Sequence, residues 1–183
     1  LGNVYNDGAL SNRNLIINGA MQVAQRGTSV TGLTSANEGY KTVDRLIHVL
    51  EATSELVVTS EQSTDAPDGF SKSVKLTVTT PETTIGSTER VQVAYQLEGQ
   101  NVQSIGTGTT SAQQLTVSFW VKSSVTGTYS TYIYGHGGSR IESHTYTINV
   151  AATWEQKTIT FSADTTTANY ADTSVAGLEL GFL

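Results

Sequence analysis

The side chains that could carry acid–base chemistry are few and widely separated in this sequence. The three histidines are His48, His136 and His144, and no two of them have the spacing of a metal-binding pair on one helix. His136 lies in the glycine-rich run 134–138, but a phosphate cradle needs a helix directly after such a run, and none is indicated. We therefore predict no metal ligand and no cofactor-binding residue.

Carboxylates are numerous enough to include a glycosidase pair, but no spacing selects two of them. Asp44 is followed directly by Arg45, which is more typical of a fixed ion pair or a turn than of an acid and a base. No serine occupies a Gly-x-Ser-x-Gly elbow. We therefore predict no catalytic residue and expect that the chain is not an enzyme. The carboxylates considered are Asp44, Glu51, Glu55, Glu89, Glu98, Glu142 and Glu155.

Aromatic residues give a stronger signal for binding, because an exposed ring can stack on a sugar while its polar tip remains hydrated. Trp120 falls on the polar parity of its predicted strand, and Tyr132 and Tyr134 share a parity on the next strand. If these faces coincide, the three rings form a ligand platform. The alternative is that Trp120 is covered by a loop or a neighbouring subunit. Trp154 opens a strand and is expected to cap the edge of the core.

The elements that must position these rings are predicted to be strands. Residues 115–122 alternate strictly, with Leu115, Val117 and Phe119 on one face, and such alternation indicates a half-buried strand. Glycine-rich and polar turns separate further candidates. About eight or more short strands, separated by short turns along the chain, are typical of a sandwich or a barrel. The other predicted strands are 55–60, 73–79, 89–97, 129–134, 143–150, 154–161 and 178–182.

Three segments are harder to interpret. Residues 1–13 are polar and turn-rich, so we expect them to be an attachment arm or linker ahead of a domain that spans residues 14–183. Residues 14–26 are predicted to form a first strand with a bend at Asn18-Gly19, and residues 43–50 to form a strand rather than a helical turn. The final segment, 178–183, reads as an apolar strand at an open edge, which predicts missing last strands or a partner segment.

Composition excludes several classes of protein. Charged residues make up 14% of the chain and the net charge is −6, with no basic run that could neutralise a row of phosphates, so nucleic acid is not an expected partner. No apolar stretch is long enough to insert in a membrane, and no secretory leader is visible at the start of the sequence. The absence of cysteine excludes disulfides and thiolate metal sites.

Five runs, in order along the chain, carry a resemblance to a known family. The longest is residues 14–29, NLIINGAMQVAQRGTS, and the others are 40–45, 117–127, 146–149 and 153–160, which read YKTVDR, VSFWVKSSVTG, YTIN and TWEQKTIT. Together these runs resemble a domain of phage tail fibres and other virion appendages, particularly those of marine phages. The chain departs from the family at Ala24, where an aromatic residue is frequent, and at Leu46, where tryptophan is frequent.

The resemblance implies an all-β fold, a jelly-roll β-sandwich of two antiparallel sheets of the carbohydrate-binding-module type. It implies a structural or receptor-recognition role in the virion, outside the cell. The implied partners are other tail proteins and further copies of the chain, expected to form a trimer. Host surface glycans are the implied ligands. The resemblance assigns no site residues, so the candidates for ligand binding remain Trp120, Tyr132 and Tyr134. The alternatives are a carbohydrate-binding module of a secreted polysaccharide-degrading enzyme and, less favoured, a depolymerase.

Overall fold

The computed structural model describes residues 14–51, 54–166 and 174–183, and their regular secondary structure is almost entirely β. The helical exceptions are α1 (Gly99–Val102) and the 3-10 turn η1 (Gln103–Ile105). The prediction of an all-β chain is confirmed. The strands are β1 (Ser29–Leu33), β2 (Gly39–Tyr40), β3 (Leu46–Glu51), β4 (Val57–Ser63), β5 (Ser73–Thr80), β6 (Arg90–Glu98), β7 (Leu115–Val121), β8 (Gly127–Gly135), β9 (Arg140–Ile148), β10 (Glu155–Phe161) and β11 (Ala176–Phe182).

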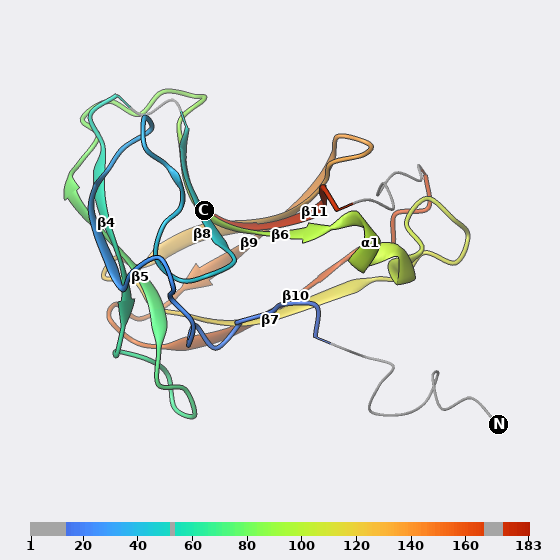
Figure 1. Cartoon of the computed structure of the whole chain (residues 1–183), viewed down its shortest axis with the longest axis horizontal. Coiled ribbons are helices and arrows are strands. Elements are labelled where there is room, and N and C mark those ends of the chain that lie inside the picture. Colours follow the sequence, from blue (N-terminus) through green and yellow to red (C-terminus); the bar gives the residue numbers. More distant parts are fainter. Residues whose placement is uncertain (1–13, 52–53, 167–173) are drawn as a thin grey trace.

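The strands form antiparallel sheets that pack as a β-sandwich. A large sheet has the order β2-β3-β6-β11-β8-β9, a lateral sheet has the order β1-β4-β5, and a ribbon consists of β10 and β7. Figure 1 shows the ribbon running beneath the large sheet, with β4 and β5 to one side. We expected two sheets, but the layer opposite the large sheet is divided into two hydrogen-bonded units. Side-chain contacts from Asp65 to Lys122 and Trp154 connect these units.

The alternation seen in the sequence of β7 decides which face of the ribbon is buried. Phe119 points toward the large sheet, where its ring lies 4.8 Å from that of Phe182 on β11 and 5.2 Å from that of Tyr146 on β9, centroid to centroid. Trp120 has the opposite parity and points outward. The face of the large sheet that carries Phe182 and Tyr146 is therefore its inner face.

Two clusters of buried apolar side chains lie on this inner side. The first is formed by the large sheet together with the helical segment α1–η1, and the second lies between β3 and the lateral sheet. Burying such side chains is the main driving force that holds the layers together. The first cluster consists of Val43, Leu46, Tyr95, Leu97, Val102, Ile105 and Leu178, and the second of Leu33, Leu50, Leu56 and Val58.

Residues 14–26 do not form the predicted first strand. Asn18 and Met21 adopt left-handed backbone conformations with φ of 62° and 57°, which an extended strand does not accommodate. The Asn18 side-chain amide donates to the carbonyls of Val23 and Asp44, and its oxygen accepts the Val23 N–H, so this asparagine organises an irregular loop. The apolar residues of the run still serve the core, because Leu15, Ile16 and Met21 pack against the first cluster.

The prediction of an open edge at the final strand is also wrong. β11 lies between β6 and β8 and is hydrogen-bonded to both, so it is an interior strand of the large sheet. Its continuous burial, rather than alternation, is typical of an interior strand. The predicted arm, residues 1–13, lies outside the described residues. Within the part of the chain that is described, no helix has the length and apolarity needed to cross a membrane.

Candidate functional site

The outer face of the large sheet, which is turned away from the ribbon, brings polar side chains from several strands side by side. Glu179 on β11 is paired in register with Gln96 on β6 and with Tyr134 on β8. Tyr40 on β2 and Tyr132 on β8 have the same orientation. Among the described residues, no strand is drawn over this side of the sheet in Figure 1. These five residues are called the outer-face cluster below.

Hydrogen bonds connect the outer-face cluster across the sheet. The Tyr40 hydroxyl donates to Gln96 Oε1 at 3.3 Å, and Gln96 Nε2 donates to Glu179 Oε2 at 2.7 Å. The other carboxylate oxygen, Oε1, accepts the Tyr132 hydroxyl at 2.5 Å. Glu179 is only 9% exposed, and these donors compensate for the loss of water around its carboxylate. The cluster is therefore held rigidly, which is what a binding surface requires.

Tyr132 is the most deeply buried aromatic residue of the outer-face cluster, at 4% exposed. Its ring lies against the bare Cα of Gly181, where an added Cβ would collide with the ring carbons. Burial, and then the neighbouring Glu179 carboxylate, raise the pKa of the Tyr132 hydroxyl far above its usual value. Tyr132 therefore acts as a neutral donor to Glu179 at any physiological pH.

His136 follows β8 at the edge of the outer-face cluster. Its Nε2 lies 3.7 Å from Glu179 Oε2, and its ring meets Tyr134 edge-on with centroids 4.8 Å apart. This nitrogen is buried and has no hydrogen-bond partner among the described residues. The His136 side chain therefore borders the outer-face cluster at the end of β8.

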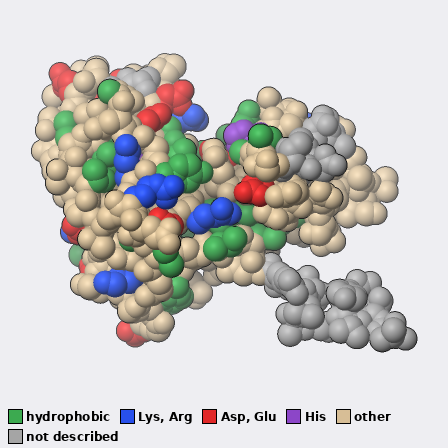
Figure 2. Space-filling model, in the orientation of Figure 1, with side chains coloured by type: hydrophobic (Ala, Val, Ile, Leu, Met, Phe, Trp, Pro, Cys, Tyr) green, Lys and Arg blue, Asp and Glu red, His purple; other side chains and the backbone are tan. Residues whose placement is uncertain are grey.

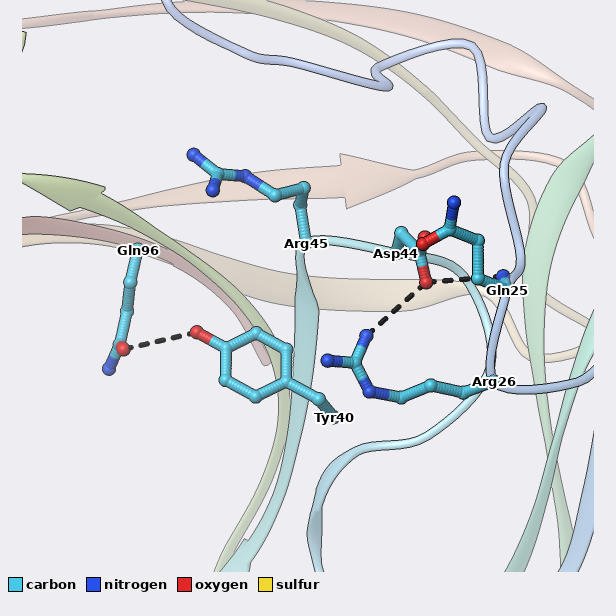
Figure 3. Close-up of a pocket in the computed structure, with 6 residues that line it drawn as sticks. All are labelled: Gln25, Arg26, Tyr40, Asp44, Arg45 and Gln96. Carbon is cyan, nitrogen blue, oxygen red and sulfur yellow. Dashed lines mark hydrogen bonds and ion pairs between the residues drawn. The ribbon is translucent and has the colours of Figure 1, made fainter.

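The outer-face cluster continues into a pocket at the β2–β3 end of the large sheet. The pocket has a volume of about 310 Å³ and shares Tyr40 and Gln96 with the cluster. In Figure 3 the Tyr40 ring lies between Gln96 and Arg26, while Arg45 extends above it. The residues that line the pocket are Gln25, Arg26, Tyr40, Asp44, Arg45 and Gln96.

The surface itself is hollowed above the large sheet. Figure 2 shows a recess between a larger and a smaller lobe, in the position that the outer face occupies in Figure 1. Lys and Arg side chains gather near the middle of the same view, beside the recess. A concave surface with a few fixed polar groups is the usual form of a ligand site.

The predicted platform of three aromatic rings is not formed. Tyr132 and Tyr134 do share the outer face of the large sheet, but Trp120 lies on the outward side of the ribbon, at the opposite surface of the sandwich. Trp120 is 38% exposed and Tyr134 is partly buried, whereas Tyr132 is buried and supports the cluster through its hydroxyl. The parities were predicted correctly, but parity does not reveal on which layer a strand lies.

Trp154 is partly buried and lies beside the β4–β5 loop, and its role as a cap on the edge of the core stays a prediction. Its Nε1 donates to Asp65 Oδ1 at 3.0 Å, and Lys122 Nζ donates to Asp65 Oδ2 at 2.6 Å and lies 5.9 Å from the centre of the Trp154 ring. The hydrogen bond from Lys122 and then that from Trp154 lower the pKa of Asp65 below its ordinary value. This group connects the ribbon with the β4–β5 loop.

Sequence reasoning missed Tyr40, Gln96 and Glu179, although each left a signal. Glu179 is a carboxylate between Leu178 and Leu180 in an otherwise apolar strand, and such a charge needs a specific partner. Gln96 has the polar parity of β6, and Tyr40 opens one of the runs that carry the family resemblance. The described residues contain no group of histidine and carboxylate side chains that could hold a metal ion.

Comparison with known proteins gives one structural likeness. No family model matches the chain, and no curated protein matches it. The chain is similar to the solved structure of the enzymatically active domain of tailspike protein 4 from bacteriophage CBA120, with a TM-score of 0.47 and 14% sequence identity. The match covers 92% of this chain and 19% of that one.

This comparison corrects one expectation. From the absence of a recognisable catalytic motif we expected that the chain is not an enzyme, but the solved structure to which it is similar is an enzymatically active domain. The exclusion of enzymatic activity is therefore withdrawn.

Proposed function

We propose that this chain is a domain of a phage tail appendage and binds a host surface glycan in the recess above the large sheet. The five runs that resemble virion appendage domains support the first part of this proposal, and they follow one another in order between residues 14 and 160. Other tail proteins and further copies of the chain, in a trimer, are its proposed partners in the virion, outside the cell.

The observation that carries the glycan proposal is the hydrogen-bonded row that runs from Tyr40 through Gln96 to Glu179. Sugars present many hydroxyl groups that both donate and accept hydrogen bonds, and amide and carboxylate side chains match them. Tyr40 is 41% exposed, so its ring is available to stack on the apolar face of a sugar. The fixed geometry reduces the entropy that is lost on binding.

A glycan array tests this proposal with three forms of the protein. Wild type is compared with Tyr40→Ala, which removes the exposed ring from the recess, and with Trp120→Ala, which removes an exposed ring from the opposite surface. We expect wild type and Trp120→Ala to bind the same glycans, and Tyr40→Ala to bind them at least about tenfold more weakly. Loss of binding in Trp120→Ala alone would move the site to the ribbon, and binding to no glycan would overturn the proposal.

A second experiment separates a virion domain from its rival, a carbohydrate-binding module of a secreted polysaccharide-degrading enzyme. Mass spectrometry of purified virions is expected to detect the chain in the particle, and its absence there would favour the rival. Incubating the glycans that bind with the protein and analysing their size tests the third possibility, a depolymerase. Shortened products would identify it, and Glu179→Gln would then test the carboxylate in the recess.

A further inference from the structure

We propose that the pocket formed by Arg26, Tyr40 and Arg45 binds an anionic group, so that the glycan recognised by this chain is an acidic one that carries carboxylate or sulfate. This inference rests on the proposed function and adds the chemical class of the ligand. The pocket adjoins the outer-face cluster through Tyr40 and Gln96, so one saccharide chain can contact both.

Arg26 contributes a guanidinium group that is only partly used by the protein. Its Nη1 lies 3.3 Å from Asp44 Oδ1, and the guanidinium carbon lies 5.6 Å from the centre of the Tyr40 ring. The Arg26 side chain is nevertheless 54% exposed. An arginine held against an aromatic ring by a single hydrogen bond retains further N–H donors, which can form a two-pronged contact with a carboxylate or a sulfate.

Arg45 provides the second guanidinium group. Its Nε donates to the Tyr95 hydroxyl at 3.4 Å, and its guanidinium carbon lies 5.7 Å from the centre of that ring. Within the described residues Arg45 has no ion pair with a carboxylate. Its backbone is in the left-handed region with φ of 77°, a costly conformation for a residue other than glycine and one that often marks functional positions.

The local charge distinguishes this pocket from the rest of the chain. Its lining contains two guanidinium groups and one carboxylate, that of Asp44. By contrast, Arg90 and Arg140 are each paired with a carboxylate, those of Glu51 and Asp164. The whole chain has a net charge of −6, so general electrostatics repel an acidic polymer. Binding of such a polymer therefore requires a local cationic site.

The neighbouring groups fit a saccharide rather than a free anion. Tyr40 presents an exposed ring beside the arginines, and Gln25 and Gln96 add side-chain amides to the pocket lining. Figure 3 shows the Tyr40 ring between Gln96 and Arg26, with the Tyr40 hydroxyl directed toward Gln96 and Arg45 extending above them. A ring face, two amides and the exposed Arg26 guanidinium, with Arg45 nearby in the pocket lining, together match a pyranose with an acidic substituent.

Two matched pairs of polysaccharides test the inference. Polygalacturonate is compared with its methyl ester, and dextran sulfate with dextran, by biolayer interferometry on the complete chain. We expect the charged member of at least one pair to bind, and its neutral partner to bind at least about tenfold more weakly. The pair that shows the preference identifies carboxylate or sulfate as the group that is recognised. Equal binding of both members, or binding of neither charged polymer, overturns the inference, while the glycan array decides separately on the proposed function.

Variants locate the binding to the pocket. Arg26→Gln is expected to weaken binding of the charged polymer about tenfold, and Arg26→Lys to have an intermediate effect because it keeps the charge but loses the planar fork. Lys75→Gln removes one positive charge from the exposed surface of β5, away from the recess, and serves as the matched control with an expected change below about twofold. Circular dichroism tests whether each variant is folded. If Arg26→Gln does not fold, Arg45→Gln replaces it in the same binding measurement. Equal effects of Arg26→Gln and Lys75→Gln would overturn the inference.

Discussion

The orientation of Glu179 depends on a single glycine. Gly181 leaves room for the Tyr132 ring, whose hydroxyl holds the carboxylate. Gly181→Ala places a Cβ against the Tyr132 ring, so we expect a loss of about 1–3 kcal/mol in the free energy of unfolding, from overpacking. Urea denaturation of the variant beside wild type measures this loss, and glycan binding is expected to weaken as well because Tyr132 is displaced.

Gly86→Ala is the matched control for this substitution. The nearest atom to its added Cβ would be the carboxyl carbon of Glu89 at 3.5 Å, an ordinary contact, and Gly86 has no left-handed backbone conformation. We expect its stability to remain within about 0.5 kcal/mol of wild type. A stable Gly181→Ala variant would mean that the Tyr132 ring can move away without cost and that the outer-face cluster is not rigid.

Trp120 and Phe119 are neighbours in sequence but should respond in opposite ways to truncation. Phe119 packs against Phe182 and Tyr146, whereas Trp120 is directed outward from the ribbon. Trp120→Ala is therefore expected to cost less than about 1 kcal/mol, and Phe119→Ala up to about 3 kcal/mol. Thermal denaturation of both variants tests this difference. A large drop in the midpoint of Trp120→Ala would show that another chain or segment covers the indole.

At the scale of elements, a buried histidine joins β3 to β4. His48 is fully buried. Its Nδ1 lies 3.3 Å from the Gly39 carbonyl oxygen, and its Nε2 lies 2.8 Å from Ser60 Oγ. The Ser60 hydroxyl is in turn 2.9 Å from Thr42 Oγ1. A neutral imidazole satisfies this arrangement when Nδ1 donates to Gly39 and Nε2 accepts from Ser60. Burial lowers the pKa of His48 below 6.5, because the charged form would lose its hydration.

This lowered pKa predicts that acidification weakens the connection between β3 and β4. Below pH about 6.5 the histidine of the unfolded chain takes up a proton while the folded chain resists it, so stability falls as the pH decreases toward the folded-state pKa. His48→Gln, which cannot titrate, should lose less stability than wild type between pH 7.5 and pH 5.5. Denaturation midpoints of both proteins at the two pH values measure this, and parallel changes would contradict the prediction.

The sequence predicted most strands because their alternation is a local property. β7 is the clearest case, since its buried and exposed positions follow directly from the order of apolar and polar residues. Residues 14–26 were misassigned because a short apolar run does not distinguish a strand from a core-packed loop, and the hydrogen bonds of Asn18 decide in favour of the loop. β2 is too short for any periodicity to indicate it.

The candidate site was predicted only in part because it depends on the order of strands in the sheet. Tyr132 and Tyr134 were placed on one face correctly, but their neighbour Glu179 is 45 or more positions distant in sequence and is brought beside them by the pairing of β11 with β8. No local pattern reveals that pairing. The same limit applies to Trp120, whose strand pairs with β10 in the other layer.

At the scale of the whole molecule, the division of the second layer makes one loop important. The lateral sheet and the ribbon share no ladder of backbone hydrogen bonds in the described chain, but Asp65 in the β4–β5 loop accepts hydrogen bonds from Lys122 and Trp154 beside the ribbon. The recess lies on the face of the large sheet that is turned away from the ribbon, so its shape depends on how firmly these two units hold that sheet.

Asp65→Ala should therefore loosen the whole sandwich rather than one strand. The variant removes the acceptor of both Lys122 and Trp154, so we expect a lower midpoint of thermal unfolding and a red shift of tryptophan fluorescence as the Trp154 indole becomes hydrated. Asp65→Asn keeps an acceptor for Trp154 but loses the charge that attracts Lys122, and should give an intermediate midpoint. Asp68→Asn, in the same exposed loop, controls for the loss of a carboxylate. If Asp65→Ala unfolds at the same temperature as Asp68→Asn, other contacts hold the two units together and Asp65 is not their link.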